Sequence, residues 1–181
     1  MSQTGPTVRK SMRGNGFRVL IATLACGAAA GVATLLGAGD AAAGTSCAAA
    51  DNARVEHVAG SSHCIANAGP GSRADARDTS GSGAALAVST QRGAATSLNL
   101  APESMALSSG ARGGSGYAIS TGPKATSVAM AHDGGTAVAI AGWGGAAYVG
   151  PDGVDCGGGY GFAYESNSGR FCVKAGGLVI R

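Results

Sequence analysis

The sequence predicts an all-β protein, an array of short strands that either stack as a narrow β-solenoid or run as a meander. Between Gly83 and Gly150, a motif of one large, one small and one large residue recurs about every ten residues. Such alternation is the period of two by which a strand places alternate side chains on one face. Glycine and proline in the intervening breaks are typical of tight turns. The motifs start at Leu86, Leu98, Met105, Tyr117, Val128, Val138 and Tyr148.

The composition points to a thin fold. Glycine occupies 33 of the 181 positions and aromatic residues make up only 4%, so small side chains supply most of the apolar content. A conventional core needs larger side chains to offset the conformational entropy lost on folding. The chain is therefore either substantially disordered or a repetitive fold whose narrow interior suits Ala, Val and Ile. The regular motif favours the repetitive fold, and we prefer the solenoid to the meander.

Residues 1–43 have the organisation of a secretory signal peptide. Four basic residues precede an uncharged run from Val19 to Gly39, and a small-residue triplet ending at Ala43 follows. We expect cleavage after Ala43 and export, so the leader is excluded from the fold. Two alternatives stay open, because the run is long enough for a retained transmembrane helix and Cys26 could carry a lipid.

The basic charge of the full chain, +3 at pH 7, comes from this leader. The leader holds four of the 13 Lys and Arg residues and one of the 10 Asp and Glu residues, which leaves nine of each in the mature chain. No basic cluster remains to follow a phosphate backbone or an anionic membrane surface. We therefore expect no nucleic-acid partner, and membrane contact only through an uncleaved leader.

Four cysteines remain after the leader is removed, and an even count in an exported chain indicates two disulfides. Two of them lie near the start of the mature chain and two near its end. Among the three pairings we therefore favour Cys47 with Cys64 and Cys156 with Cys172. Each bridge would close a short loop beside the array and contribute roughly 3 kcal/mol.

The mature chain divides into an N-terminal cap (44–70), a β-repeat array (71–150) and a C-terminal cap hairpin (151–181). In the N-terminal cap, alternation over 53–58 predicts a strand with a partner at 64–66. The polar, Gly-rich stretch 69–83 is either an exposed loop or a degenerate first repeat, in which Ala74 and Ala76 hold the small positions.

The C-terminal cap has the pattern of a hairpin. Residues 160–164 and 170–173 are predicted strands, joined by the turn 165–169. Most aromatic residues of the mature chain lie between Trp143 and Phe171. We expect them to give this end a denser core than the array has. Trp143 could display its ring to a partner or a sugar, but we prefer the interpretation that it is a core plug.

The stretches 126–131 and 136–141 resemble the Ser-Val-Ala-Ile-Gly repeats in the head domains of trimeric autotransporter adhesins. The resemblance covers about residues 83–149 and implies stacked parallel strands with Val and Ile inward, three packed chains and a surface adhesin. The repeat here, about ten or eleven residues, is shorter than the family's unit. As a whole, the chain resembles a family of small exported actinobacterial proteins with a leader, a Gly/Ala/Thr-rich middle and flanking cysteines. That resemblance implies export and this architecture, but no mechanism.

No motif for catalysis or for a cofactor stands out. No serine has the two flanking glycines of a nucleophile elbow, and no lysine of the mature chain completes a phosphate-binding loop. Asp152 and Asp155 could bind calcium weakly. A zinc site would draw on Cys47, His57, His63 and Cys64. Because an exported chain more often oxidises its cysteines, we expect no catalytic, cofactor-binding or metal-ligating residue.

By elimination, the sequence predicts a non-enzymatic structural or interaction protein of the cell envelope or extracellular space. Its partner would be an unknown protein or envelope component, and a homo-oligomer stays open. The alternative is a small secreted protein that binds a ligand or an ion through its C-terminal aromatic cap.

Overall fold

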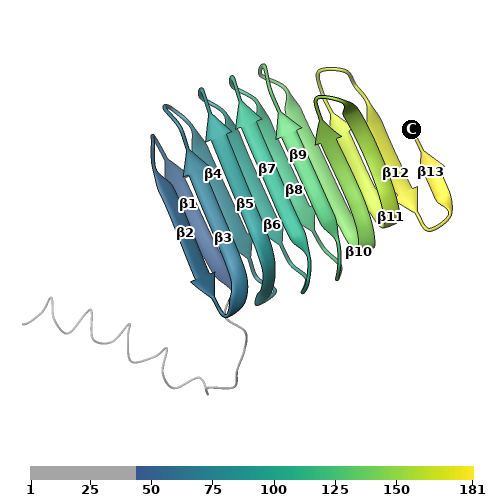
Figure 1. Cartoon of the computed structure of the whole chain (residues 1–181). Helices are drawn as coiled ribbons and strands as arrows, with labels where there is room; N and C mark the ends of the chain where they lie inside the picture. Colours follow the sequence, from purple (N-terminus) through teal and green to yellow (C-terminus); the bar gives the residue numbers. More distant parts are fainter. Residues whose placement is uncertain (1–43) are drawn as a thin grey trace, which may run out of the picture. The chain divides into compact units, whose positions relative to one another are not determined.

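The computed structural model describes residues 44–181, which form thirteen β-strands and, within that range, no helix (Figure 1). The strands wind into a β-solenoid of about four turns. Strands that follow one another along the stack are parallel, whereas a meander joins antiparallel neighbours by short turns. The predicted all-β solenoid is therefore confirmed, and the meander alternative is wrong.

Two walls of strands face each other across a thin interior. The first wall contains β1 (Thr45–Ala50), β4 (Arg73–Asp78), β6 (Ala94–Asn99), β8 (Ser115–Ser120) and the start of β10 (Thr136–Gly150). The second wall contains β2 (Arg54–Ala59), β3 (Ser61–Ala68), β5 (Ser82–Thr90), β7 (Met105–Ala111), β9 (Thr126–Ala131) and the end of β10. The long strand β11 (Gly153–Glu165) follows β10 along both walls. Beyond it, β12 (Phe171–Ala175) and β13 (Leu178–Ile180) extend the first wall.

One coil of the solenoid takes 21 residues. Arg73 pairs with Ala94, Ala94 with Ser115 and Ser115 with Thr136, each time one coil further on. Every coil supplies one strand to each wall, so the apolar motif recurs twice per coil. The spacing of about ten residues in the sequence is therefore half of the structural repeat.

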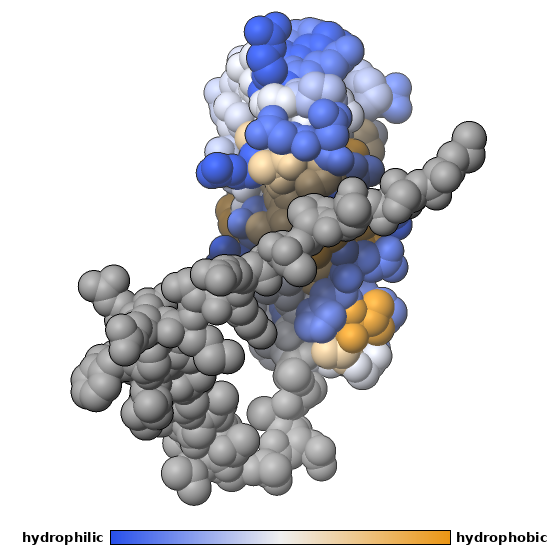
Figure 2. Space-filling model, turned by 90° about the vertical axis from the view of Figure 1, so that its left-hand side faces the viewer, coloured by the Kyte–Doolittle hydropathy of each residue, from blue (hydrophilic) through white to orange (hydrophobic). Residues whose placement is uncertain are grey.

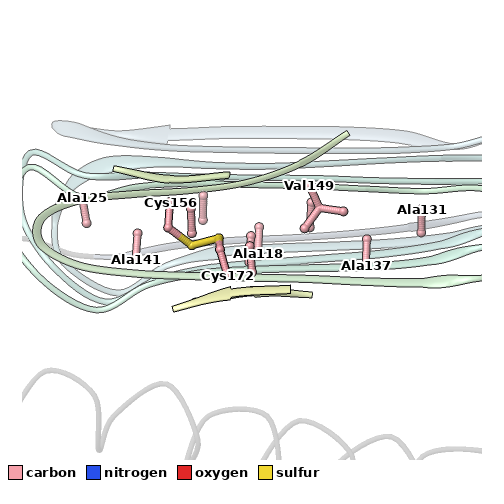
Figure 3. Close-up of a cluster of buried hydrophobic side chains, with 13 residues drawn as sticks. Ala118, Ala125, Ala131, Ala137, Ala141, Val149, Cys156 and Cys172 are labelled. Carbon is pink, nitrogen blue, oxygen red and sulfur yellow. A yellow bond between two sulfur atoms is a disulfide. The ribbon is translucent and has the colours of Figure 1, made fainter. Parts of the chain in front are cut away.

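Small side chains fill the interior, and the large apolar side chains point out of both walls. Along β8, Gly116, Ala118 and Ser120 are buried, while Tyr117 and Ile119 lie on the outside. Other coils repeat this pattern, and Figure 3 shows the alanines pointing into the space between the walls. The expectation that Val and Ile point inward is therefore wrong for most of the array, and Val149 on β10, which is fully buried, is an exception.

The walls lie too close together for larger side chains. At Gly116, a Cβ atom would collide with the carbonyl oxygen of Ser109 on the facing wall, and at Gly110 with that of Ala94. Interiors are packed to a fixed density, and inserting bulk forces the backbone apart. Volume, rather than hydrophobicity, therefore decides which residue of each alternating pair faces inward.

Antiparallel strands close both ends of the stack. At the N-terminal end β1 pairs with β4 and β2 with β3, and at the C-terminal end β11 pairs with β10. The predicted partners 53–58 and 64–66 lie in the β2–β3 hairpin, and the predicted strands 160–164 and 170–173 lie in β11 and β12. The short strand β13 was not predicted. These end strands pair with the outermost parallel strands, whose backbone groups would otherwise have no neighbouring strand to bond to.

The stretch 69–83 is more ordered than a loop. It contains β4, whose Ala74 and Ala76 are fully buried against the second wall. The degenerate-repeat interpretation is therefore correct, and the exposed-loop interpretation is wrong.

Both disulfides join the two walls, one at each end of the stack. Cys47 on β1 bonds to Cys64 on β3, and Cys156 on β11 bonds to Cys172 on β12. Figure 3 shows the second bridge crossing the interior. The predicted pairing is confirmed, because each pair lies at one end of the array and on opposite walls.

The expected signal peptide (1–43), its cleavage point and Cys26 lie outside the described residues. Within residues 44–181, no helix has the length and apolar character needed to cross a bilayer.

Candidate interaction surface

Large apolar side chains gather on the outside of the first wall, from β6 to β13. We call this surface the aromatic face. It consists of Leu98, Tyr117, Ile119, Val138, Ile140, Tyr160, Phe162, Tyr164, Phe171, Val173, Leu178 and Ile180. From β6 to β12 these residues alternate along their strands mostly with buried alanine, serine, asparagine, glycine or cysteine, whereas on β13 the intervening Val179 is exposed as well.

The strand register sets these side chains in rows that cross the strands. The first row runs through Leu98, Ile119, Ile140, Phe162, Val173 and Ile180. The second row runs through Thr96, Tyr117, Val138, Tyr164 and Phe171. Because paired strands lie about 4.8 Å apart, side chains within a row contact one another. The aromatic face is therefore a continuous flat surface rather than a set of isolated residues.

The aromatic residues of the C-terminal cap lie on the surface. Tyr160, Phe162 and Phe171 are 55%, 37% and 42% exposed. The expected denser core at this end is therefore wrong. Trp143 is 72% exposed on the turn within β10, so the expected core plug is wrong as well.

A charged strip borders the aromatic face on its N-terminal side. On β4, Arg73, Asp75 and Arg77 take the outward positions, and Arg77 donates to Asp75 at 3.0 Å. Between this strip and β6 lies a shallow trough of about 300 Å³, floored by Ala94 and Ala95. The apolar surface therefore has a sharp polar limit on this side.

The second wall carries a narrower apolar ladder on its outside. The register aligns Ile65, Leu86, Leu107, Val128 and Tyr148. Glu56 on β2 and Asp155 on β11 end this row with charges. Exposed Val58, Met105 and Met130 lie on the same wall. What distinguishes the second wall is that, in the described part of the chain, its outside carries one Phe, Tyr or Trp ring, that of Tyr148, against five on the aromatic face.

A buried polar network lies at the N-terminal end of the interior. Asp78 and Asn99 are fully buried. Asp78 accepts hydrogen bonds from Ser62 Oγ at 2.6 Å, from Ser80 Oγ at 2.5 Å and from Asn99 Nδ2 at 3.0 Å. These donors offset the cost of burying a carboxylate. Because no atom of Asp78 reaches the surface, the network is a structural feature and not a reaction site.

The turns after β5, β7 and β9 form a polar edge, which appears in hydrophilic colours at the top of Figure 2. There Arg112 donates to Asp133 of the next coil, at 3.0 Å for one of its two contacts. Hydrogen bonds from Arg112 and His132 hold the pKa of Asp133 well below its usual range, and Asp133 in turn raises the pKa of Arg112. Both side chains are exposed, so this pair contributes little to stability.

The metal sites considered from the sequence are not assembled. Cys47 and Cys64 are bonded to each other, so neither supplies a thiolate for zinc. Asp155 accepts a hydrogen bond from Arg181 at 2.7 Å. Among residues 44–181, no three His, Cys, Asp or Glu side chains come together so as to hold a metal ion.

A family model matches residues 13–175, about nine tenths of the sequence, and covers every described strand except β13. The chain belongs to DUF6764, a family of unknown function. Searches of curated proteins and of solved structures found no significant match. The DUF6764 match spans every coil of the solenoid and all four paired cysteines.

Proposed function

We propose that this DUF6764 chain is an exported, non-enzymatic structural or interaction protein of the cell envelope or extracellular space, which acts through its aromatic face. The observation that carries the proposal is the reversed distribution of side chains. Large apolar residues, including four aromatic rings on β11 and β12, stay on the surface while alanine and serine fill the interior. Extended exposed apolar surfaces of this kind mark interaction sites.

Export is supported by the cysteines and by the leader. Two disulfides are more typical of proteins outside the cytoplasm, where thiols are not kept reduced. The basic start, the uncharged run and the triplet ending at Ala43 fit a signal peptide. The resemblance to small exported actinobacterial proteins, and to stacked-strand adhesin heads, supports the same location and a role in surface display.

The test of export is the intact mass of the protein recovered from the medium and from the envelope of its native host. We expect the mass of residues 44–181 less four hydrogens, shifting by four units of mass only after reduction. A protein that keeps residues 1–43 and five free thiols inside the cell would contradict the proposal. An added lipid at Cys26 would place the protein at a membrane instead of free in the envelope.

The role of the aromatic face is tested with two matched substitutions. Phe162→Glu places a charge on the aromatic face, and Leu107→Glu places the same charge on the outside of the second wall. In fractionated cells we expect Phe162→Glu to be lost from the fraction that retains the native protein, and Leu107→Glu to be retained. Equal behaviour of the two variants would contradict a role for the aromatic face. A catalytic activity abolished by replacing one polar residue would contradict the non-enzymatic assignment.

A second candidate is the binding of a small ligand through the C-terminal rings. Tyr160, Phe162 and Tyr164 stand on the same side of β11, with Phe171 beside them on β12. Such rings offer flat apolar surfaces and, for tyrosine, a polar end. Calorimetric titration with calcium and with simple glycans tests this candidate. The absence of a binding signal with both would contradict it.

A further inference from the structure

We infer that the aromatic face binds a second copy of this chain, forming a two-fold dimer in which the two first walls pack face to face. The inference rests on the proposed role of the aromatic face and names its partner. Three observations carry it: the chemistry of the rows, the limits of the apolar surface and the match between its size and that of a stable interface.

The chemistry of the first row requires an apolar partner. It consists of Leu98, Ile119, Ile140, Phe162, Val173 and Ile180, none of which offers a hydrogen bond through its side chain. A glycan would leave hydroxyl groups without partners against this row, at a cost for each. A flat apolar sheet packs best on another flat apolar sheet, about 10 Å away.

The limits of the apolar surface suit one particular symmetry axis. The aromatic face spans six strands, in the order β6, β8, β10, β11, β12, β13. A two-fold axis parallel to the strands and midway between β10 and β11 places β6 on the partner's β13, β8 on its β12 and β10 on its β11. The charged strip of β4 then lies beyond the partner's edge, in water. An axis along the stack would instead set the charged strip of β4 against the same strip of the partner and bury its charges.

Side chains match across this axis. Because the axis is parallel to the strands, each row meets the same row of the partner. Ile140 then faces the partner's Phe162, and Tyr117 faces the partner's Phe171. The bulky Tyr160 faces the partner's Gly142. Within one chain, Tyr160 also pairs with Gly142 in the strand register. Two-fold interfaces use one self-complementary patch in this way.

The size of the surface is that of a dimer interface. Strands about 4.8 Å apart, four of them contributing about six residues of about 3.3 Å while β12 contributes five and β13 three, give a footprint of roughly 500 Å². Projecting side chains make the accessible area larger than the footprint. A standard interface removes about 800 Å² from each partner, so the aromatic face is large enough to hold two copies together.

Sedimentation velocity on the full chain, and on the chain without residues 1–43, tests the inference. We expect a dimer in the micromolar range, a monomer for Phe162→Glu and a dimer for the control Leu107→Glu. Circular dichroism confirms that each variant keeps its strands. A native monomer at all concentrations, or a Phe162→Glu dimer, would overturn the inference. Monomers that bind a soluble glycan would assign the face to a carbohydrate and overturn it too.

A mixing experiment tests the register itself. Ile140→Lys and Phe162→Glu each place two unpaired charges at their own dimer interface, so each is expected to be monomeric. In a mixed dimer, the lysine of one chain meets the glutamate of the other, and the remaining pair is native. Recovery of the dimer on mixing supports this axis, and two variants that stay monomeric together overturn it. Export and envelope retention are measured in separate experiments. A monomeric protein would therefore overturn the dimer without contradicting export or the proposed role of the aromatic face.

Discussion

Asn99 donates a hydrogen bond from Nδ2 to Oδ1 of Asp78, at 3.0 Å, from the next coil of the solenoid. Both side chains are fully buried. Ser62 and Ser80 add donors to the same carboxylate. The network therefore connects β3, β4 and β6 at the N-terminal end of an interior that is filled mostly by alanine and serine.

Replacing Asp78 should destabilise the fold. Asp78→Ala removes the acceptor that Ser62 and Asn99 share, although Ser62 keeps its contact with Thr45 and Asn99 still donates to the carbonyl of Ser104. We expect a loss of about 1–3 kcal/mol in the free energy of unfolding. The control is Asp75→Ala, which removes an outward-facing, partly buried carboxylate from the same strand and should cost less than about 1 kcal/mol. Chemical denaturation measures both. Similar losses for the two variants would show that the buried network is not important.

Enlarging an inward side chain should also destabilise the fold. Ala118 is fully buried between the walls, whereas its neighbour Ile119 points outward. We expect Ala118→Leu to cost about 3 kcal/mol or to prevent folding, because the walls cannot separate at one coil alone. The outward control Ile119→Leu keeps its volume and should cost less than about 1.5 kcal/mol. Thermal unfolding compares them, and a stable Ala118→Leu protein would contradict the narrow interior.

Removing the C-terminal disulfide should loosen one end only. The double variant Cys156→Ser with Cys172→Ser removes the bridge between β11 and β12, whose closed loop is worth about 3 kcal/mol. Native-state hydrogen exchange should show lost protection in β12 and β13 but not in β6 and β8, because each coil contacts only its neighbours. Uniform loss of protection would indicate a single cooperative unit instead.

The turn between β11 and β12 should be sensitive to acid. The hydroxyl of Ser168, with the amides of Asn167 and Ser168, donates to Glu165 and lowers its pKa. A carboxylate with a lowered pKa stabilises the folded turn above its ordinary value of about 4.3, and this contribution is lost as the pH falls through the lowered pKa. Ser168→Ala removes the largest cause, so we expect the pKa of Glu165 to rise. A carboxyl NMR titration measures it, and an unchanged pKa would contradict the contact.

Much of the fold could be predicted from the sequence because alternation is local. The motif located the strands of the array, and the positions of the cysteines near its two ends favoured the correct pairs. The number of strands per coil was not accessible, because half-coils on opposite walls carry the same motif. The spacing of about ten residues was therefore taken for the repeat, although one coil takes 21.

The candidate surface could not be predicted, because alternation does not say which residue of a pair faces inward. In Leu86–Ala87–Val88, hydrophobicity alone would bury the leucine and the valine. The structure buries Ala87, since the distance between the walls leaves room only for small side chains. The same reversal moves Phe162 and Phe171 from the expected core to the aromatic face. Alanine at five of the seven middle positions was the available clue.

The most direct test of this side-chain distribution is cysteine accessibility along β8. Tyr117, Ala118, Ile119 and Ser120 are replaced one at a time by cysteine, with the native disulfides intact, and each folded protein is exposed to a maleimide. We expect rapid labelling at positions 117 and 119 and protection at positions 118 and 120 until the protein unfolds. The opposite pattern would place the large side chains inside, and both the narrow interior and the aromatic face would then be wrong.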